Sequence, residues 1–336
     1  MIIRENIPLS SLTTMRLGGP ARYVIDIESP FDIEPAFNFA QDRNLPFRIL
    51  GGGANTIAHD EGFAGVIIHS AMSGITDNIR QDPSYIITVL SGTEWDSVVA
   101  HACARGLTGI EALSKIPGHA GAAPVQNIGA YGQDIAGTFH SADVYDIKNH
   151  RFLTLSAADL HFSYRHSIMN TTHKGHYFVI SITLALATGE MPRPFYASLE
   201  RFIAKHHITD LSPSSIRTAV SSIRADKLPD PALIPSAGSF FKNIYLTEPE
   251  ATLAEQKGIP VYHGHDGYKI NSAWLIEQVG LKGQLLHGFR ISYSAPLVLI
   301  NESATSYADL AAARTEIISA VRKKFNYTLE QEPEEI

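Results

Sequence analysis

The residues from Ile116 to Asp134 form the stretch of this chain whose composition points most directly to chemistry. The stretch reads IPGHAGAAPVQNIGAYGQD, and glycine, alanine and proline fill more than half of it. So much glycine and proline disfavours a packed helix or a central strand. Small side chains let a ligand lie against the backbone, whose N–H groups can hold an anion. The stretch predicts an anion-binding loop, with a close-packed structural loop as the alternative.

A second glycine-rich loop follows the apolar run Phe47–Leu50 and reads GGGANT, from Gly51 to Thr56. The loop lacks the sixth-position glycine of a dinucleotide fingerprint, and no Lys-Ser/Thr pair follows as in a P-loop. A plain turn after a strand would explain this loop taken alone. Two such loops in one chain favour phosphate binding more than either does by itself.

Composition and charge narrow the class of protein. The 336 residues carry a formal charge of −7 and 44% apolar residues, which suits a globular protein with a core. The largest basic cluster is Arg322-Lys323-Lys324, so we expect no nucleic-acid surface. The single cysteine, Cys103, falls in an apolar helical run and predicts a buried, inert thiol in a reducing compartment. No apolar run approaches the roughly 18–20 residues of a membrane span, and we expect a cytoplasmic protein without a membrane partner.

The elements that must position these loops follow from hydrophobic periodicity, which predicts an α+β chain. Helices are expected at Ile33–Asp42, Trp95–Arg105, Ser272–Val279 and Tyr307–Phe325, with helical patterning up to about His206. Strands are expected at Arg22–Ile27, Phe47–Leu50, Val66–His69, Tyr85–Leu90, Phe139–Ile147, Phe152–Leu155, Phe178–Leu186 and Leu297–Ile300. The break Arg224–Pro231 predicts a domain boundary. The acidic tail Leu329–Ile336 is of a kind that is normally disordered.

Five motifs, taken in order, resemble the UDP-N-acetylenolpyruvoylglucosamine reductases of bacterial peptidoglycan synthesis. They are Arg48–Asn55, the long stretch Ile116–Gly132, Tyr164-Arg165-x-Ser167, Gly238–Asn243 and Leu329-Glu330-x-Glu332. The resemblance covers nearly the whole chain. Tyr196, after Gly189, resembles the tyrosine of the subtype whose extra loop closes over the nucleotide.

The resemblance implies a fold and a division into domains. It implies a two-subdomain FAD-binding fold of the vanillyl-alcohol oxidase type plus a C-terminal α/β substrate-binding domain. The expected boundaries are residues 1–72 and 73–225 for the two FAD-binding subdomains and 226–326 for the substrate-binding domain. Residues 327–336 are expected to form a tail that returns to the active site.

The resemblance also implies the residues of the site. The catalytic set is Arg165, Ser239 and Glu332. FAD, bound noncovalently, would be held by Gly51, Gly52, Gly53, Ala54, Asn55, Thr56, Pro117, Gly118, Gly121, Ala122, Ala123, Gln126, Asn127, Gly129, Ala130, Tyr131 and Arg224. The UDP-sugar would be bound by Tyr164, Tyr196, Lys227, Asn243, Tyr262 and Lys269. NADPH would be the hydride donor, and no protein partner is implied.

The chemistry of the family's reaction gives these residues physical roles. Hydride from reduced flavin would add to the β-carbon of an enol ether, and negative charge would develop toward the carboxylate. Arg165 offers a guanidinium matched to that charge. Ser239 would give the proton to the α-carbon, and Glu332 would orient the enol and help relay protons. Glu334 is the alternative to Glu332, because Pro333 follows Glu332 where relatives usually have an aliphatic residue.

Three other interpretations compete with the reductase. A flavin oxidase would keep the fold, and His119 would then be a candidate for covalent flavin attachment. A sensor of flavin or nucleotide sugar would bind without catalysis. The run His263-Gly264-His265-Asp266 could hold a metal, but two histidines in a glycine-rich turn are usually polar loop residues, and we expect no metal.

Overall fold

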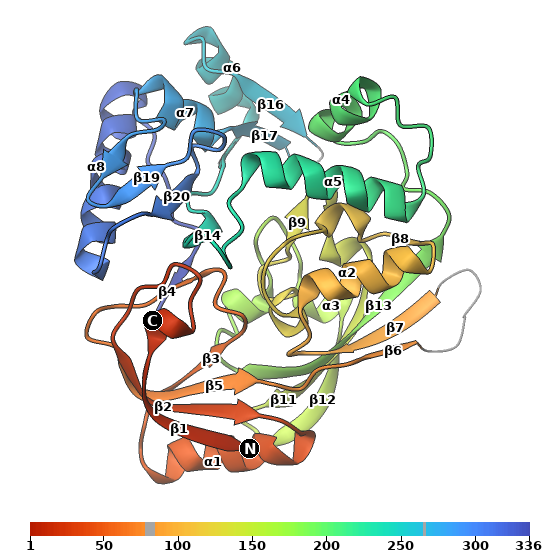
Figure 1. Ribbon diagram of the computed structural model, residues 1–336, viewed down its shortest axis with the longest axis vertical. Helices are drawn as coiled ribbons and strands as arrows, with labels where there is room; N and C mark the ends of the chain where they lie inside the picture. The colour runs from red at the N-terminus through yellow and green to blue at the C-terminus, as the bar shows by residue number, and fades with distance from the viewer. Residues whose placement is uncertain (78–84, 265–266) are drawn as a thin grey trace. The chain divides into compact units, whose positions relative to one another are not determined.

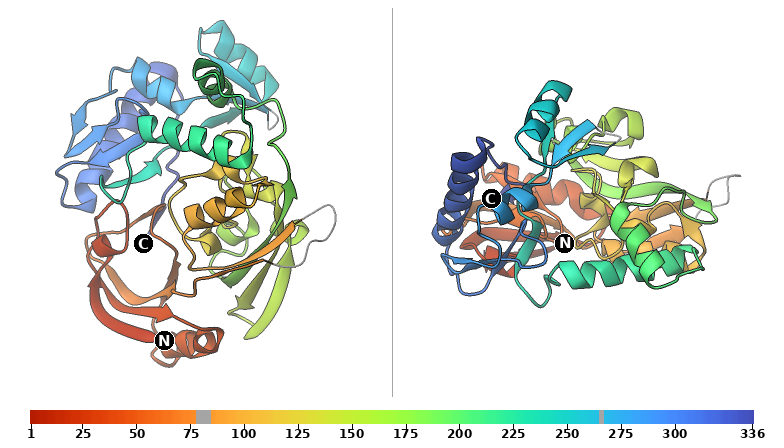
Figure 2. Two further views of the ribbon diagram at one scale, coloured as in Figure 1. Left: turned by 45° about the vertical axis from the view of Figure 1, so that its right-hand side comes forward. Right: turned by 90° about the horizontal axis from the view of Figure 1, so that it is seen from above.

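The protein is described by a computed structural model, for residues 1–77, 85–264 and 267–336. The chain forms two compact units, each assembled from several stretches of sequence (Figures 1 and 2). The first unit contains Met1–Ile7, Ala21–Gly52 and Ala64–Asp226, and the second contains Pro8–Pro20, Gly53–Phe63 and Lys227–Ile336. The sequence analysis did not anticipate that the two short N-terminal stretches belong with the C-terminal third. The expected boundary at residue 72 stays a prediction.

The first unit opens with a four-stranded sheet of order β1-β2-β5-β3. Its strands are β1 (Ile2–Pro8), β2 (Pro20–Ile27), β3 (Phe47–Leu50) and β5 (Phe63–Ser70). The helix α1 (Ile33–Asp42) buries Ile33, Ala36, Phe37 and Ala40, which recur at helical spacing. Figure 1 shows α1 along one face of this sheet, where its buried side chains share a core with Ile25 and Val66.

A second, larger sheet in the same unit has the order β12-β11-β13-β7-β6, with β8 also paired to β13. Its strands are β6 (Ile75–Asp77), β7 (Tyr85–Leu90), β8 (Leu107–Thr108), β11 (Phe139–Asp146), β12 (Arg151–Ser156) and β13 (Tyr177–Thr188). These pairs are antiparallel. The helix α2 (Trp95–Ala104) contributes Trp95, Val98, Val99 and Ala102 to the core of this sheet.

Shorter elements complete the first unit. The hairpin β9 (Gly129–Ala130) and β10 (Gln133–Asp134) lies within the glycine-rich stretch. The short helix α3 (Ala157–Leu160) begins with a capping box at Ser156. The helices α4 (Ala197–Lys205) and α5 (Pro213–Lys227) bury Leu199, Ile216 and Val220 in a common cluster. The sequence analysis did not predict α5.

The second unit contains a four-stranded antiparallel sheet and the longest helix. The sheet has the order β14-β20-β19-β18, made of β14 (Ser236–Ser239), β18 (Leu285–Leu286), β19 (Phe289–Ile291) and β20 (Val298–Asn301). The helix α8 (Tyr307–Phe325) packs against β19 (Figure 1) and buries Leu310, Ala313, Ile317 and Val321. Met15, Leu17 and Ile57 join the same core from far earlier in the chain.

A small antiparallel sheet of order β15-β17-β16 also belongs to the second unit. It contains β15 (Ile244–Leu246), β16 (Val261–Gly264) and β17 (Gly267–Ile270), and α6 (Glu248–Gln256) packs on it. The helix α7 (Ser272–Gln278) follows directly. Finally, β21 (Glu334–Glu335) pairs in parallel with β4 (Thr56–Ile57).

The α+β class and the predicted elements are confirmed, with ends shifted by at most three residues. A tail of this composition is normally disordered, but here β21 gives the last residues a hydrogen-bonded partner. Among the described helices, none has the length and apolarity needed to cross a membrane.

Candidate active site

The two glycine-rich loops meet inside the first unit. A Cβ placed on Gly52 would lie 2.9 Å from the Cα of Gly118, and one on Gly51 would lie 3.0 Å from the Cβ of Ala122. Neither position tolerates a larger residue without movement of the other loop. The loops predicted separately from the sequence therefore form one cradle lined by main chain.

The glycine stretch is fixed at the end of β7. The amide of Ala120 donates to Thr93 O at 2.8 Å, and the amide of Gly121 donates to Ser91 O at 2.9 Å. A Cβ on Gly121 would lie 2.5 Å from the Cβ of Ser91, so glycine permits this close approach. At Ala120 and Gly121 the stretch is therefore a closely packed loop, the alternative that the sequence analysis left open.

The rest of the first glycine loop, Gly53–Thr56, belongs to the second unit. Gly53 has a φ of +64°, and its carbonyl accepts from the amide of Thr14 at 3.1 Å. Within the described parts of the chain, nothing accepts a hydrogen bond from the amides of Gly53 and Ala54. Adjacent amides of this kind fit the phosphate oxygens of a dinucleotide cofactor. These amides therefore suit the diphosphate of FAD.

Arg165 is held by a turn that is anchored to the glycine stretch. Its φ of 54° is left-handed, and Asn170 Nδ2 donates to its carbonyl at 3.0 Å. Asn127 Nδ2 donates to Ser163 O at 3.1 Å, and Ser167 Oγ donates to Val125 O at 2.7 Å. Because the turn is bonded to the loop on both sides, the guanidinium is aimed at Gly129, and Nη2 donates to its carbonyl at 3.1 Å.

The side chain of Asn127 is engaged in hydrogen bonds within the protein. Besides the bond to Ser163, Asn127 Oδ1 accepts from the amide of Ala136 at 3.1 Å, and the residue is 4% exposed. A side chain so engaged shapes the loop. Any contact of Asn127 with FAD would come from its main chain.

Tyr131, Tyr196 and Arg224 lie together in the first unit. The rings of Tyr131 and Tyr196 meet edge to face with centroids 6.1 Å apart. Burial raises the pKa of Tyr131. Burial also lowers the pKa of Arg224, and the nearby charge of Arg165 acts in the same direction. Tyr131 and Arg224, predicted for FAD, and Tyr196, predicted for the substrate, are thus neighbours in the first unit.

Two of the three predicted catalytic residues lie on hydrogen-bonded segments of the second unit. Ser239 ends β14 after Gly238, whose φ is +67° and where the register with β20 shifts. Phe240 follows, and its carbonyl accepts from the amide of Glu332 at 2.9 Å. The tail therefore brings Glu332 to the residue next to Ser239.

Glu332 and Glu334 differ in their main-chain hydrogen-bond partners. The amide of Glu334 donates to Asn55 O at 3.0 Å, and Glu334 is paired with Thr56. Glu332 is the acidic residue bonded beside Ser239, whereas Glu334 lies one step further, on the glycine loop. This arrangement favours the sequence frame that selects Glu332.

Two predicted substrate residues lie on the small sheet of the second unit, and a third directly precedes it. Tyr262 and Lys269 are direct partners across β16 and β17, so their side chains share a face. Asn243, just before β15, accepts from the amide of Ser272 at 3.2 Å through Oδ1. Tyr245 is the partner of Lys269 on the other side and shares that face. The sequence analysis predicted no strand at Tyr245.

The remaining predicted residues are placed without a distinctive contact. Lys227 ends α5 and is exposed, Pro117 is exposed, and Gln126 and Ala130 are half-buried. Tyr164 lies beside Arg165, whose Cζ is 5.3 Å from the ring centroid. Arg165 belongs to the first unit, and Ser239 and Glu332 belong to the second.

The histidines give no support to a metal centre. His263 pairs with Glu255 at 3.2 Å, while His265 and Asp266 lie outside the described residues. Across the described ranges, no three ligating side chains gather into a metal site. His119 pairs with Glu94 at 3.3 Å, and burial is the main cause of its lowered pKa.

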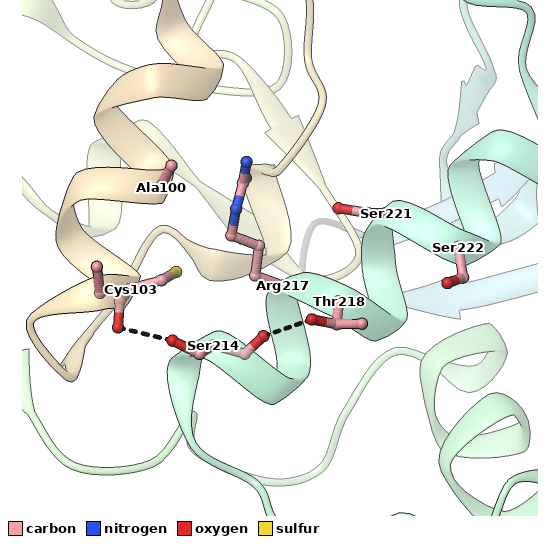
Figure 3. A pocket seen from close by; sticks show the side chains of 8 residues that line it. Ala100, Cys103, Ser214, Arg217, Thr218, Ser221 and Ser222 are labelled. Atoms are coloured by element: carbon pink, nitrogen blue, oxygen red, sulfur yellow. Dashed lines mark hydrogen bonds between the residues drawn. The ribbon is translucent and has the colours of Figure 1, made fainter.

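The hollow drawn in Figure 3 is distinct from the predicted site. It has a volume of about 410 Å³ and lies between α2 and α5, where Ser214 Oγ donates to Cys103 O at 3.0 Å. None of its lining residues is a predicted site residue. Cys103 is buried, as the sequence predicted, and burial raises the pKa of its thiol to about 12.

Comparison with known proteins identifies the family. Residues 230–336 match the model described as "UDP-N-acetylenolpyruvoylglucosamine reductase, C-terminal domain", and residues 21–146 match "FAD binding domain". A reductase of that name from Ralstonia nicotianae is 35% identical, covering 99% of this chain and 98% of its own length. The chain belongs to the UDP-N-acetylenolpyruvoylglucosamine reductase family. The predicted resemblance is thereby confirmed.

Further reductases agree with this assignment. The Thermobifida fusca reductase is 37% identical over 98% of this chain and 96% of its own length. The crystal structure of the reductase from Thermus caldophilus is 23% identical, covers 99% of both chains and has a TM-score of 0.68, which shows the same fold. The chain is accordingly an FAD-binding flavin oxidoreductase, as predicted.

Proposed function

We propose that this chain uses FAD and NADPH to reduce the enolpyruvyl group of UDP-N-acetylenolpyruvoylglucosamine, giving UDP-N-acetylmuramate for peptidoglycan synthesis. Membership of the reductase family supports the reaction. The observation that carries the residue assignment is the hydrogen bond from the amide of Glu332 to the carbonyl of Phe240, beside Ser239. Since a single cysteine also suits a reducing compartment, we further propose a cytoplasmic location.

We assign the holding of FAD to the two glycine loops. The main chain of Gly51–Thr56 and Pro117–Ala123 would bind the diphosphate, and Gln126–Tyr131 would line the flavin. Glycine at positions 52 and 121 lets these loops pack closely on Gly118 and Ser91, which fixes the course of the main chain proposed to bind FAD. When bound and reduced by NADPH, the flavin supplies the hydride that adds to the β-carbon of the substrate.

Arg165 is assigned the role of stabilising the negative charge that develops on the substrate. Its guanidinium presents several donors in a plane, a geometry that matches a carboxylate. Because the turn around Arg165 is bonded to the glycine stretch through Asn127 and Ser167, the charge is positioned before the reaction. Fixed charge of this kind needs no rearrangement as the reaction proceeds.

Ser239 and Glu332 are assigned the transfer of a proton to the α-carbon of the substrate. A serine hydroxyl is a weak acid, so Ser239 requires the strongly basic enolate as its acceptor. Glu332, bonded to the next residue of the chain, would orient the enol and help relay the proton. Lys242, which also neighbours this segment, pairs its ammonium group with Glu330.

Binding of the UDP-sugar is assigned to side chains of both units. Asn243, Tyr262 and Lys269 would bind from the small sheet, where Tyr262 and Lys269 already share a face. Lys227 and Lys269 would bind the negative diphosphate. Tyr164 and Tyr196 belong to the first unit, and the 48% exposure of Tyr196 suits a residue of the subtype loop.

The test is anaerobic consumption of NADPH by the FAD-loaded protein, with and without the enolpyruvyl UDP-sugar. We expect one NADPH to be consumed per substrate molecule. If NADPH bleaches the flavin and only dioxygen restores its colour, the protein is an oxidase and the proposed reaction is wrong. A flavin that NADPH never bleaches would instead identify a sensor.

A further inference from the structure

The guanidinium of Arg314, on α8, grips the C-terminal tail on both sides of Glu332. Arg314 Nη1 donates to Gln331 Oε1 at 2.6 Å and also bonds Glu335 Oε1. The Arg314 side chain is 22% exposed and that of Glu335 is 32% exposed, so this ion pair is shielded in part from water. Such a pair is stronger than one on an open surface.

The contact is part of a closed network. Arg314 Nη2 donates to the hydroxyl of Tyr307 at 3.2 Å, and the ring of Tyr307 stacks on His59 with centroids 3.8 Å apart. His59 Nε2 in turn contacts Glu335 Oε2 at 3.1 Å. Gln331 Nε2 donates to Pro333 O at 2.8 Å and to Glu335 Oε1 at 3.2 Å. Both carboxylate oxygens of Glu335 are therefore satisfied by side chains.

This network surrounds the point at which the tail changes its main-chain partner. Before that point, the amide of Glu332 donates to Phe240 O at 2.9 Å, beside Ser239. Beyond it, the amides of Glu334 and Ile336 donate to Asn55 O and Ile57 O at 3.0 and 2.8 Å. Pro333 stands between and has no amide hydrogen to donate. Backbone bonding alone thus leaves a gap immediately after Glu332.

The side chains of Gln331 and Glu335 span that gap, and the one guanidinium that holds both is Arg314. A planar fork with several donors can bind two acceptors at once, which a lysine at the same place could not do with comparable geometry. Fixing the residues on either side of Glu332 fixes the place of Glu332 itself.

We propose that Arg314 is a positioning residue for the reaction, which sets Glu332 beside Ser239 by gripping Gln331 and Glu335. The inference rests on the proposed function, because it assigns Arg314 to the same proton-handling step. Arg314 does not touch the reacting atoms in this assignment and acts through the tail.

The test compares Arg314→Gln and Arg314→Lys with the native FAD-loaded enzyme in stopped flow. Flavin reduction by NADPH should be unchanged in both variants. Reoxidation of the reduced flavin by the enolpyruvyl UDP-sugar should slow by about tenfold or more in Arg314→Gln. It should slow less in Arg314→Lys, which keeps the charge but not the fork. The substrate concentration at half-maximal rate should stay within about twofold, since the UDP-sugar residues are untouched.

Matched variants separate positioning from stability. Arg322→Gln removes an exposed arginine from the same helix and should leave both half-reactions unchanged. Glu335→Gln removes the other charge of the ion pair and should reproduce the slowing seen in Arg314→Gln. If the double variant Arg314→Gln/Glu335→Gln is no slower than either single variant, the two residues act as one unit.

The outcomes distinguish this inference from the proposed function. Glu332→Gln slowing the substrate half-reaction while Arg314→Gln leaves it unchanged would overturn the positioning role and leave the function intact. Equal slowing of both half-reactions in Arg314→Gln would mean a general structural defect and would also overturn it. If Glu332→Gln has no effect, the assignment of Glu332 fails first, and the role of Arg314 fails with it.

Discussion

At the scale of single residues, Ser239 is the assignment with the clearest chemical consequence. Replacing Ser239 by Ala removes the proposed proton donor but leaves β14 and its partner β20 in place. Flavin reduction by NADPH should be nearly unchanged. Reoxidation by the substrate should slow by about 10²–10⁴, as is typical of a lost general acid. Rapid-mixing absorbance of the flavin measures both steps.

Ser303→Ala is a matched control, because Ser303 is an exposed serine of the same unit. It should alter neither half-reaction. Substrate reduction at the native rate in Ser239→Ala would remove Ser239 from the mechanism. Slower flavin reduction by NADPH in Ser239→Ala would show that the substitution disturbs more than the proton.

Asp96 gives a residue-scale prediction about stability. Arg217 donates to both oxygens of this carboxylate at 2.6 and 2.9 Å, joining α5 to α2, and the amide of Lys115 donates at 2.7 Å. Burial alone would raise the pKa of Asp96, but these bonds outweigh it and hold the pKa well below its usual range. The ionised form therefore stabilises the folded state.

Asp96→Asn should lower the free energy of unfolding by about 1.5–3 kcal/mol, the range for hydrogen bonds to charged groups. A lowered pKa contributes its full stability above the unfolded value of about 3.9, and loses it as pH falls toward the folded value. The gap between native protein and variant should thus be constant from pH 7 to 5 and shrink below 4. Urea titrations measure it, with the exposed Asp226→Asn as control. A gap that varies between pH 5 and 7 would contradict this account.

At the scale of elements, β21 links the tail to the proposed cofactor loop. Its pairing with β4 gives Asn55 O and Ile57 O their amide partners. Deleting Glu334–Ile336 should loosen Gly53–Thr56 and weaken FAD binding by about tenfold, the equivalent of one or two hydrogen bonds. Titration of the apoprotein by flavin fluorescence measures the affinity. Glu332→Gln, which keeps β21, should bind FAD normally, and equal affinity in the deletion would separate β21 from the cofactor.

The elements also show what the sequence could predict. The bounds of α1 and α8 were predicted because apolar residues recur at helical spacing and end at polar turns. The helix α5 was missed because Ser214, Ser215, Ser221 and Ser222 weaken the contrast between its faces. Three-residue strands such as β15 are too short to show a period.

Less of the candidate site could be predicted from sequence patterns. Local composition identified the glycine loops, because a high glycine content can be recognised from neighbouring residues alone. The hydrogen bond between Glu332 and Phe240 joins segments that are far apart in the sequence. Hydrophobic periodicity predicts helices and strands, but not which distant segments pair. Arg314 was missed for this reason, because its role depends entirely on what α8 contacts.

At the scale of the whole molecule, the division between the two compact units falls between Gly52 and Gly53, within the proposed diphosphate loop Gly51–Thr56. A noncovalent ligand that binds only the folded chain stabilises it by mass action. FAD at a hundredfold excess over its dissociation constant should add about 2.7 kcal/mol. This corresponds to a rise of several degrees, at about 2–4 °C per kcal/mol for a chain or domain of 150–250 residues.

Thermal unfolding of the apoprotein at increasing FAD should therefore show a midpoint that climbs with the logarithm of free FAD. Riboflavin, which lacks the diphosphate, should shift it little, because the glycine loops are proposed to bind that group. Flavin attached covalently through His119 would behave differently. The midpoint would not respond to added FAD, and acid precipitation would leave the yellow colour with the protein. Since His119 is paired with Glu94 and packed beside Gly52, we expect the concentration-dependent result.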